Sequence, residues 1–194
     1  TCVEEWAPII KEVDFKGIII SITNPCDVIA EYMQKLSGLP KERVIGTGTV
    51  IDTARMKNAV AKYVDLDPDS IDGYVIGEHG NSQFVAWSKV YIASKPINEI
   101  LDEKTFDQIE EAARMKGFEI IKGKGYTSYG IANATTIIVE TIFKDAKTIL
   151  PVSSYSSEAG CYIGHPAAVG RNGIIRDIHL ELNEKEQEKW DHSV

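Results

Sequence analysis

Short apolar runs alternate with amphipathic stretches in the first third of the chain. Residues 17–22 form a continuous β-branched run, which is typical of a strand buried on both faces. Residues 27–35 then have helical periodicity, and a Ser-Gly-Leu-Pro sequence ends them at 37–40. The order repeats with a strand at 43–46, a glycine turn and a helix over 49–66. A strand, a turn and a helix make half of a parallel α/β unit, so we expect part of a parallel sheet here.

Beyond residue 46 the pattern changes to strands that border tight turns. Strands are expected over five segments, 74–76, 83–87, 148–153, 161–169 and 174–182. The last two flank Asn172-Gly173, and an Asn-Gly pair between β-rich runs is a strong hairpin signal. Antiparallel pairing is therefore predicted for the later strands.

Helical periodicity predicts helices over 105–121 and 127–145, and a last helix from 184 that Asn183 would cap. The second of these has apolar residues at four helically spaced positions, so we expect it to be mostly buried. The predicted fold is α/β followed by α+β. Residues 1–45 would form the C-terminal part of a Rossmann-type parallel sheet, and residues 46–194 a catalytic, substrate-binding α+β domain.

Composition narrows the classes of partner. The chain has 194 residues and a net charge of −8, which disfavours nucleic acid and anionic membranes as partners. No apolar run approaches the roughly 20 residues of a membrane span. The cysteines, Cys2, Cys26 and Cys161, are too widely spaced for a metal site and suit a reducing cytosol. We therefore expect a cytoplasmic protein without a metal, since His79 also lacks the second histidine of a zinc helix.

Three side chains between residues 46 and 80 carry candidate chemistry. Asp52 and Arg55 are three residues apart, so a helix over 49–66 places both on one face near its first turn. His79 lies between glycines, directly after the apolar run 74–76, and a strand there would deliver it to the end of a sheet. Imidazole serves as a general acid and base near neutrality, and a guanidinium binds a carboxylate through two parallel hydrogen bonds. An acid–base site for a small anionic substrate is the functional hypothesis.

Each of these residues also has a purely structural interpretation. Asp52 would stabilise a helix N-terminus, Arg55 would face solvent, and His79 would be an ordinary turn residue. Two glycine-rich stretches are poor nucleotide motifs. Residues 46–48 lack the third glycine of a dinucleotide fingerprint, and residues 123–125 lack the spacing of a phosphate loop.

Several stretches taken together resemble the lactate/malate dehydrogenase family. They are SITNPCD at 21–27, GTGTVIDTAR at 46–55, GEHGNS at 77–82 and GKGYTS at 123–128. The resemblance runs in order through essentially the whole chain. Within the family, residues 65–68 and 80–88 are most similar to L-2-hydroxyisocaproate dehydrogenase, a branch that acts on bulkier 2-oxo acids.

The resemblance implies an NAD-dependent oxidoreductase that interconverts an L-2-hydroxy acid and a 2-oxo acid, either lactate or a bulkier branched acid. It implies that His79 gives a proton to the carbonyl oxygen and that Asp52 holds the imidazole. Arg55 would clamp the substrate carboxylate, Asn24 would bind near the nicotinamide and the substrate oxygen, and Thr127 would line the side-chain pocket. A homo-oligomer, dimer or tetramer, is also implied.

The family's glycine-rich dinucleotide half and its mobile loop with a second arginine are absent from this sequence. They would precede Thr1, so we expect poor cofactor binding and little activity from this piece alone. Three alternatives stay open: a malate dehydrogenase, a nicotinamide-dependent glycosidase of related fold, and a non-catalytic oligomerisation segment. Residues 53–55 are more similar to the lactate side of the family than to the malate side.

Overall fold

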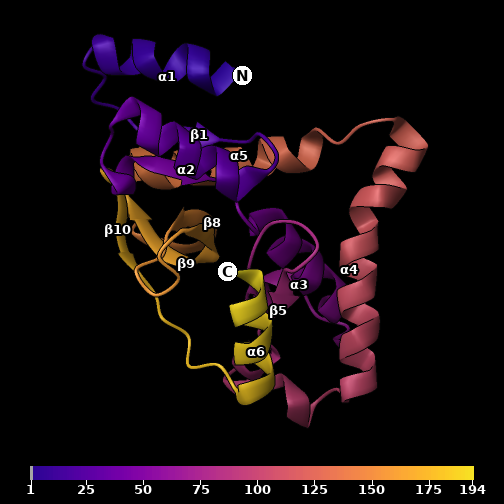
Figure 1. Ribbon diagram of the computed structural model, residues 1–194. Helices are drawn as coiled ribbons and strands as arrows, with labels where there is room; N and C mark the ends of the chain where they lie inside the picture. Colours follow the sequence, from indigo (N-terminus) through magenta and orange to yellow (C-terminus); the bar gives the residue numbers. More distant parts are fainter. Residues whose placement is uncertain (1) are drawn as a thin grey trace.

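The computed structural model describes residues 2–194, apart from the side chain of residue 118 (Figure 1). The helices are α1 (Cys2–Glu12), α2 (Cys26–Ser37), α3 (Val50–Val64), α4 (Glu103–Lys124), α5 (Tyr129–Lys144) and α6 (Glu184–Ser193). The strands are β1 (Ile19–Ser21), β2 (Val44–Gly46), β3 (Ile71–Asp72), β4 (Val75–Ile76), β5 (Phe84–Val85), β6 (Tyr91–Ile92), β7 (Lys95–Pro96), β8 (Thr148–Tyr155), β9 (Tyr162–Gly170) and β10 (Gly173–Asp177).

One mixed sheet, in the order β1-β2-β8-β9-β10, joins the two parts of the chain. β1 and β2 are parallel, while β8, β9 and β10 are antiparallel, and β2 meets β8 where Gly46 pairs with Ser153. The predicted fold class, α/β followed by α+β, is confirmed. The division between residues 45 and 46 falls beside this junction and stays a prediction.

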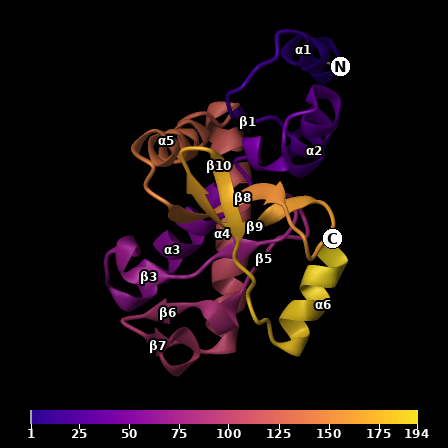
Figure 2. The ribbon, with the colours of Figure 1, turned by 90° about the vertical axis from the view of Figure 1, so that its left-hand side faces the viewer.

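Helices cover both faces of this sheet. Figures 1 and 2 show α2 on one side of β1 and α5 on the other. Val44 and Ile45 of β2 are both completely buried, Val44 among residues of α2 and Ile45 among residues of α5. Because helices cover both faces of β2, this strand has no polar side chain.

A second core lies below the sheet, between α3 and α4. Met56 and Val60 of α3 pack there against Phe106 and Ile109 of α4 and against Ile71 of β3. Two small sheets, β3-β6-β7 and β4-β5, complete this region. The hairpin formed by β4 and β5 carries His79, so the core beneath α3 also supports the candidate site.

The predicted hairpin after β9 is confirmed. Gly170 pairs with Gly173, which leaves Arg171 and Asn172 as the two turn residues. Gly173 has a φ of +100°, and a Cβ added there would lie 1.9 Å from the carbonyl oxygen of Glu42. Only glycine fits this position, because any side chain would also meet the backbone of the neighbouring segment.

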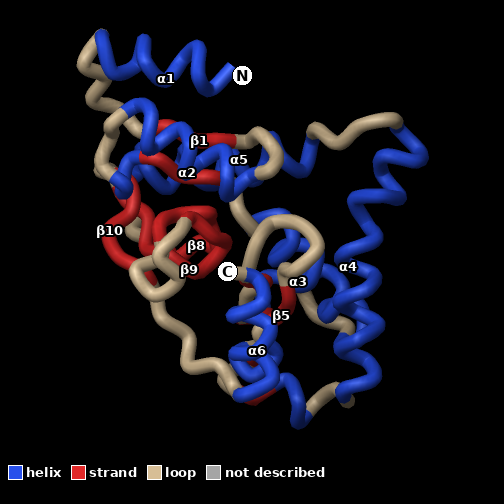
Figure 3. The backbone as a smooth tube through the Cα atoms, viewed as in Figure 1, coloured by secondary structure: helices blue, strands red, loops and turns tan. Residues whose placement is uncertain are grey.

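Two predictions of strand length and one prediction of helix burial were wrong. The strand expected at 83–87 covers only Phe84–Val85, and a 3₁₀ turn follows at Trp87–Lys89. The strand expected at 174–182 ends at Asp177, and Figure 3 shows a loop from there to α6. The alternating leucines of that loop pack against Trp190 instead of extending the sheet.

The third error concerns α5, which we expected to be mostly buried. Only Ala134, Ile138 and Thr141 of this helix are buried, while the side chain of Phe143 is 76% exposed. α5 covers one face of the sheet, so its opposite side faces outward. None of the helices in residues 2–194 has the length and apolarity needed to cross a bilayer.

Candidate active site

Two threonines fasten the start of α3 to β4. Thr49 donates its hydroxyl to the carbonyl oxygen of Val75 at 2.6 Å, and the Thr53 hydroxyl accepts from the Val75 amide at 3.0 Å. Both threonines are buried. These bonds hold the first turn of α3, which carries Asp52, beside the strand that leads to His79.

The predicted convergence of three side chains is observed. Asp52 lies between the other two, and its side chain is only 5% exposed. One of its oxygens, Oδ2, lies 2.9 Å from Nδ1 of His79, and the other, Oδ1, accepts from Nη1 of Arg55 at 3.1 Å. A carboxylate therefore sits behind the imidazole with a guanidinium beside it, and the roles that the resemblance implies remain predictions.

These contacts displace the pKa values of both partners. The hydrogen bond to Asp52 raises the pKa of His79 above its ordinary value, against the opposing effect of burial. For Asp52, burial is the largest single influence and acts upward, but the bond from His79 and the charges of His79 and Arg55 together lower its pKa. The pair thus favours an imidazolium next to a carboxylate.

The outer ring nitrogen of His79 has no hydrogen-bond partner among the described residues. Its Nδ1 is the only ring atom bonded to the protein, and a quarter of the side chain is exposed. An Nδ1–H that donates to Asp52 leaves Nε2 to hold or release a proton toward a ligand. This is the arrangement required for general acid–base chemistry.

Two residues that hold the main chain of this loop were missed by the sequence reasoning. The buried carboxylate of Asp27 accepts from the His79 amide at 2.8 Å, and the Ser193 hydroxyl accepts from the Glu78 amide at 2.7 Å. The hydroxyl of Ser193 also lies 3.0 Å from that of Ser82. Asp27 appears in sequence as an ordinary first-turn helix acid, and no local pattern links it to a residue 52 positions later.

Arg55 lines a groove of about 530 Å³ between α3, α4 and α5. Apart from the bond to Asp52, its guanidinium has no partner in the described part of the chain. A Cβ added at Gly117 of α4 would lie 3.5 Å from Nη1 of Arg55. The apolar residues on the groove walls are Val50, Ile51, Ala54, Ala59, Ala112, Ala113, Ile120, Ala134 and Ile137.

No hydrogen bond joins Asn24 or Thr127 to these three residues in the described part of the chain. Asn24 is exposed directly after β1, and Thr127 is exposed in the loop that joins α4 to α5. Neither side chain makes a hydrogen bond to another described residue. Their predicted roles therefore depend on a ligand and stay predictions.

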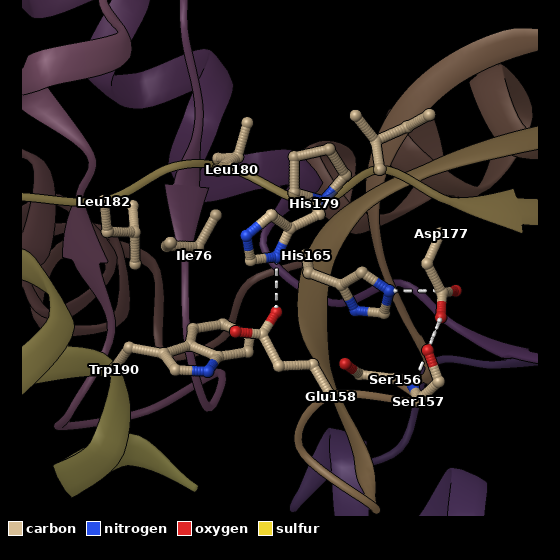
Figure 4. A pocket seen from close by; sticks show the side chains of 12 residues that line it. Ile76, Ser156, Ser157, Glu158, His165, Asp177, His179, Leu180, Leu182 and Trp190 are labelled. Atoms are coloured by element: carbon tan, nitrogen blue, oxygen red, sulfur yellow. Dashed lines mark hydrogen bonds and ion pairs between the residues drawn. The ribbon is translucent and has the colours of Figure 1, made fainter.

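A second cavity, of about 310 Å³, lies elsewhere, beneath the loop that leads to α6. Figure 4 shows two imidazoles at its wall, each already paired with a carboxylate. Nε2 of His165 lies 3.2 Å from Asp177, and Nδ1 of His179 lies 2.7 Å from Glu158. No cluster of three or more potential metal ligands occurs among the described His, Cys, Asp and Glu residues.

Comparison with known proteins matches the chain to one family. The family model of the lactate/malate dehydrogenase α/β C-terminal domain matches residues 49–194. The L-lactate dehydrogenase 2 of Listeria innocua serovar 6a is 43% identical over 189 residues, which cover 93% of this chain and 61% of that protein. The L-lactate dehydrogenase of Streptococcus equinus is 40% identical over 191 residues, covering 93% of this chain and 58% of that protein.

Solved structures agree with this match. A minor L-lactate dehydrogenase of Enterococcus mundtii in ligand-bound form is 35% identical with a TM-score of 0.93, covering 98% of this chain and 65% of that one. The malate dehydrogenase of Aeropyrum pernix is 31% identical with the same TM-score of 0.93, covering all of this chain and 64% of that one. The chain thus spans about three fifths of the length of its curated relatives. From the family match, the sequence identities and the shared fold, the chain belongs to the lactate/malate dehydrogenase family.

Proposed function

We propose that the full-length protein is an NAD-dependent oxidoreductase that interconverts an L-2-hydroxy acid and a 2-oxo acid. The observation that carries the proposal is the His79–Asp52 pair, in which the outer nitrogen of His79 has no described partner and Asp52 also binds the Arg55 guanidinium. Its relatives bear the name L-lactate dehydrogenase, which supports the same reaction class.

His79 supplies the proton in this proposal. As the imidazolium it protonates the carbonyl oxygen of the 2-oxo acid, and as the neutral ring it takes the proton back in the reverse direction. Asp52 fixes the tautomer and stabilises the charged ring through the 2.9 Å contact. Because that contact raises the pKa of His79, the acid form persists above the ordinary titration range near pH 6.5.

Arg55 binds the substrate carboxylate. Its planar guanidinium has donors beyond the one given to Asp52, and two parallel bonds would orient the substrate as well as attract it. The groove that Arg55 lines has mostly apolar walls, which suits the side chain of a 2-oxo acid. Thr127 belongs to the loop between α4 and α5 and would line the pocket for that side chain.

The carboxyl end of the parallel pair suits a nicotinamide ring. Ligands of parallel sheets bind beyond the carboxyl ends of the strands, and Asn24 presents an exposed amide there with no partner among the described residues. Asn24 would hold the ring near His79. The nicotinamide cofactor, when bound, supplies or accepts the hydride.

The size of the substrate side chain distinguishes lactate from bulkier branched acids, and the resemblance favours the bulkier branch. Malate dehydrogenase is the second candidate, because the malate dehydrogenase of Aeropyrum pernix matches this fold as well as the lactate enzymes do. A homo-oligomer is expected in either case.

Initial rates of the full-length protein with NADH and three 2-oxo acids test the proposal. We expect turnover of pyruvate or 4-methyl-2-oxopentanoate to exceed that of oxaloacetate. Preference for oxaloacetate would support the malate alternative. A folded, cofactor-binding protein that turns over none of the three would contradict the proposal and would favour a non-catalytic or glycosidase role.

A further inference from the structure

We propose that Asp27 is a positioning residue for His79, holding the main chain of the acid–base histidine while Asp52 holds its ring. The proposal rests on the function proposed above for His79 and adds to it a second carboxylate, supplied by α2. Asp27 accepts from the His79 amide at 2.8 Å, across 52 residues of sequence.

The surroundings of Asp27 make it an unusual place for a carboxyl group. The residue is 6% exposed, and one of its oxygens, Oδ1, has no hydrogen-bond partner in the part of the chain that the structure describes. Burial raises its pKa, and the Ser153 hydroxyl and the His79 amide partly offset that effect. The Ser153 hydroxyl lowers the pKa of Asp27 without forming a regular hydrogen bond to it. A buried, half-satisfied carboxyl is costly to fold, so its position calls for a specific use.

The geometry indicates that Asp27 fixes the conformation of the loop that carries His79 between Gly77 and Gly80. Gly77 has a φ of +102°, and Gly80 lies on the other side of His79, so the loop needs external contacts to keep one conformation. Asp27 supplies the contact at His79 itself, and Ser193 supplies one at Glu78. A small displacement of a reacting group lowers the rate strongly, so a second anchor on the same residue bears directly on the chemistry.

Asp27 also contributes charge. Its carboxylate raises the pKa of His79, in the same direction as Asp52 and against Arg55. Glu78 is the charged neighbour within the loop, and α6 contributes the uncharged Ser193. The charged residues that α4 contributes to a cavity beside Asp52 are Asp107, Glu110, Glu111 and Arg114. Two carboxylates from two different helices therefore act on one imidazole.

The location of Asp27 gives the anchor a further consequence. Asp27 is three residues from Asn24, the residue expected to meet the nicotinamide, at the start of α2. The same turn of chain would place the cofactor ring and the proton donor relative to each other. Proton transfer and hydride transfer to one carbonyl group require that the proton donor and the cofactor ring keep fixed positions relative to each other.

Asp27→Asn and Asp27→Ala distinguish the hydrogen bond that Asp27 accepts from the His79 amide from the effect of its negative charge on the His79 ring. Asparagine keeps an oxygen for the His79 amide but removes the charge, so we expect the His79 ring to titrate a few tenths to about one pH unit lower. Alanine removes both, so we expect hydrogen exchange at the His79 amide to accelerate about tenfold or more. In the full-length protein its kcat should fall about 10–100-fold with KM nearly unchanged.

Asp177→Asn is the matched control, because that carboxylate also binds a histidine and a loop amide but lies outside the site. It should leave the exchange and titration of His79 unchanged. Wild-type exchange and titration of His79 in both Asp27 variants would overturn the proposal. If Asp27→Ala does not fold, Asp27→Asn decides alone, because a neutral amide oxygen is a weaker acceptor than a carboxylate. Wild-type exchange at the His79 amide together with a wild-type titration in that variant overturns the proposal. If the wild-type protein turns over no 2-oxo acid, the proposed function fails. Hydrogen exchange of the His79 amide and titration of its ring, both measured by NMR, still decide whether Asp27 positions His79.

Discussion

Two His–Asp pairs among the described residues use their rings differently. Asp52 binds one nitrogen of His79 and leaves the other without a described partner. His165 has acceptors at both nitrogens, since Nδ1 lies 2.9 Å from the Ile163 carbonyl oxygen and Nε2 lies 3.2 Å from Asp177. Both ring nitrogens of His165 thus face protein oxygens, and neither is open to a substrate.

The difference shows that a His–Asp contact alone does not make a catalytic site. His165 is 6% exposed on the long strand β9, and its partner lies at the end of the adjacent strand β10. His79 lies in a loop, a quarter exposed, with Arg55 within reach of the same carboxylate. The open nitrogen and the nearby cation distinguish the candidate active site from a structural pair.

Replacing each histidine by asparagine should give the largest contrast. His79→Asn removes the proposed proton donor, and we expect kcat/KM of the full-length protein to fall by about 10²–10⁴. His165→Asn should change kcat/KM less than about threefold, because that ring would only join β9 to β10. Steady-state rates with the preferred 2-oxo acid measure both. Equal losses in the two variants would remove the distinction.

A smaller effect is expected from the cations beside the two pairs. Arg55→Lys loses the bidentate geometry, and a lost hydrogen bond between charged groups weakens binding about 10–100-fold, mainly as a rise in KM. Arg176→Lys, at an exposed position next to Asp177 in the sequence, is the control and should leave KM unchanged. An Arg55→Lys enzyme with the KM of the wild type would show that the carboxylate binds elsewhere.

The smallest expected effect is the loss of fold stability when Asp177 is replaced. Its hydrogen bond with His165 lowers the pKa of Asp177, so the bond stabilises the fold above the ordinary carboxyl pKa of about 3.9 and loses its effect as pH falls through the lowered value. Asp177→Asn should lower Tm by about 2–4 °C at neutral pH, for about 1 kcal/mol lost. The difference from wild type should shrink toward pH 3. A constant difference at every pH would refute the assignment of the shift to this pair.

Local patterns predicted the parts of the fold that local physics determines. The buried run of β2, the Asn-Gly hairpin and the cap at Asn183 all appear as expected, because each depends on residues close in sequence. The hairpin β6–β7 was missed, since it is only two residue pairs long and has no alternating pattern. The leucines after β10 showed strand alternation but pack on α6 instead.

The candidate site likewise contains residues that the sequence predicted and residues that only the folded structure reveals. The spacing of Asp52 and Arg55 was enough to predict a shared helix face, and the apolar run 74–76 was enough to predict that His79 follows a strand. Asp27 and Ser193 reach this loop from 52 and 115 residues away, so only the folded chain brings them to it. Contacts of this kind have no periodicity or spacing that sequence reasoning can detect.

The pH dependence of 2-oxo acid reduction in Asp52→Asn tests the central claim most directly. Because Asp52 raises the pKa of His79, kcat/KM of the wild type should fall with rising pH at a value above about 6.5. Without the carboxylate this fall should move about 1–3 pH units lower, while Asp177→Asn keeps the wild-type profile. An Asp52→Asn profile that coincides with the wild type would contradict the account of His79 as the acid–base group that Asp52 tunes.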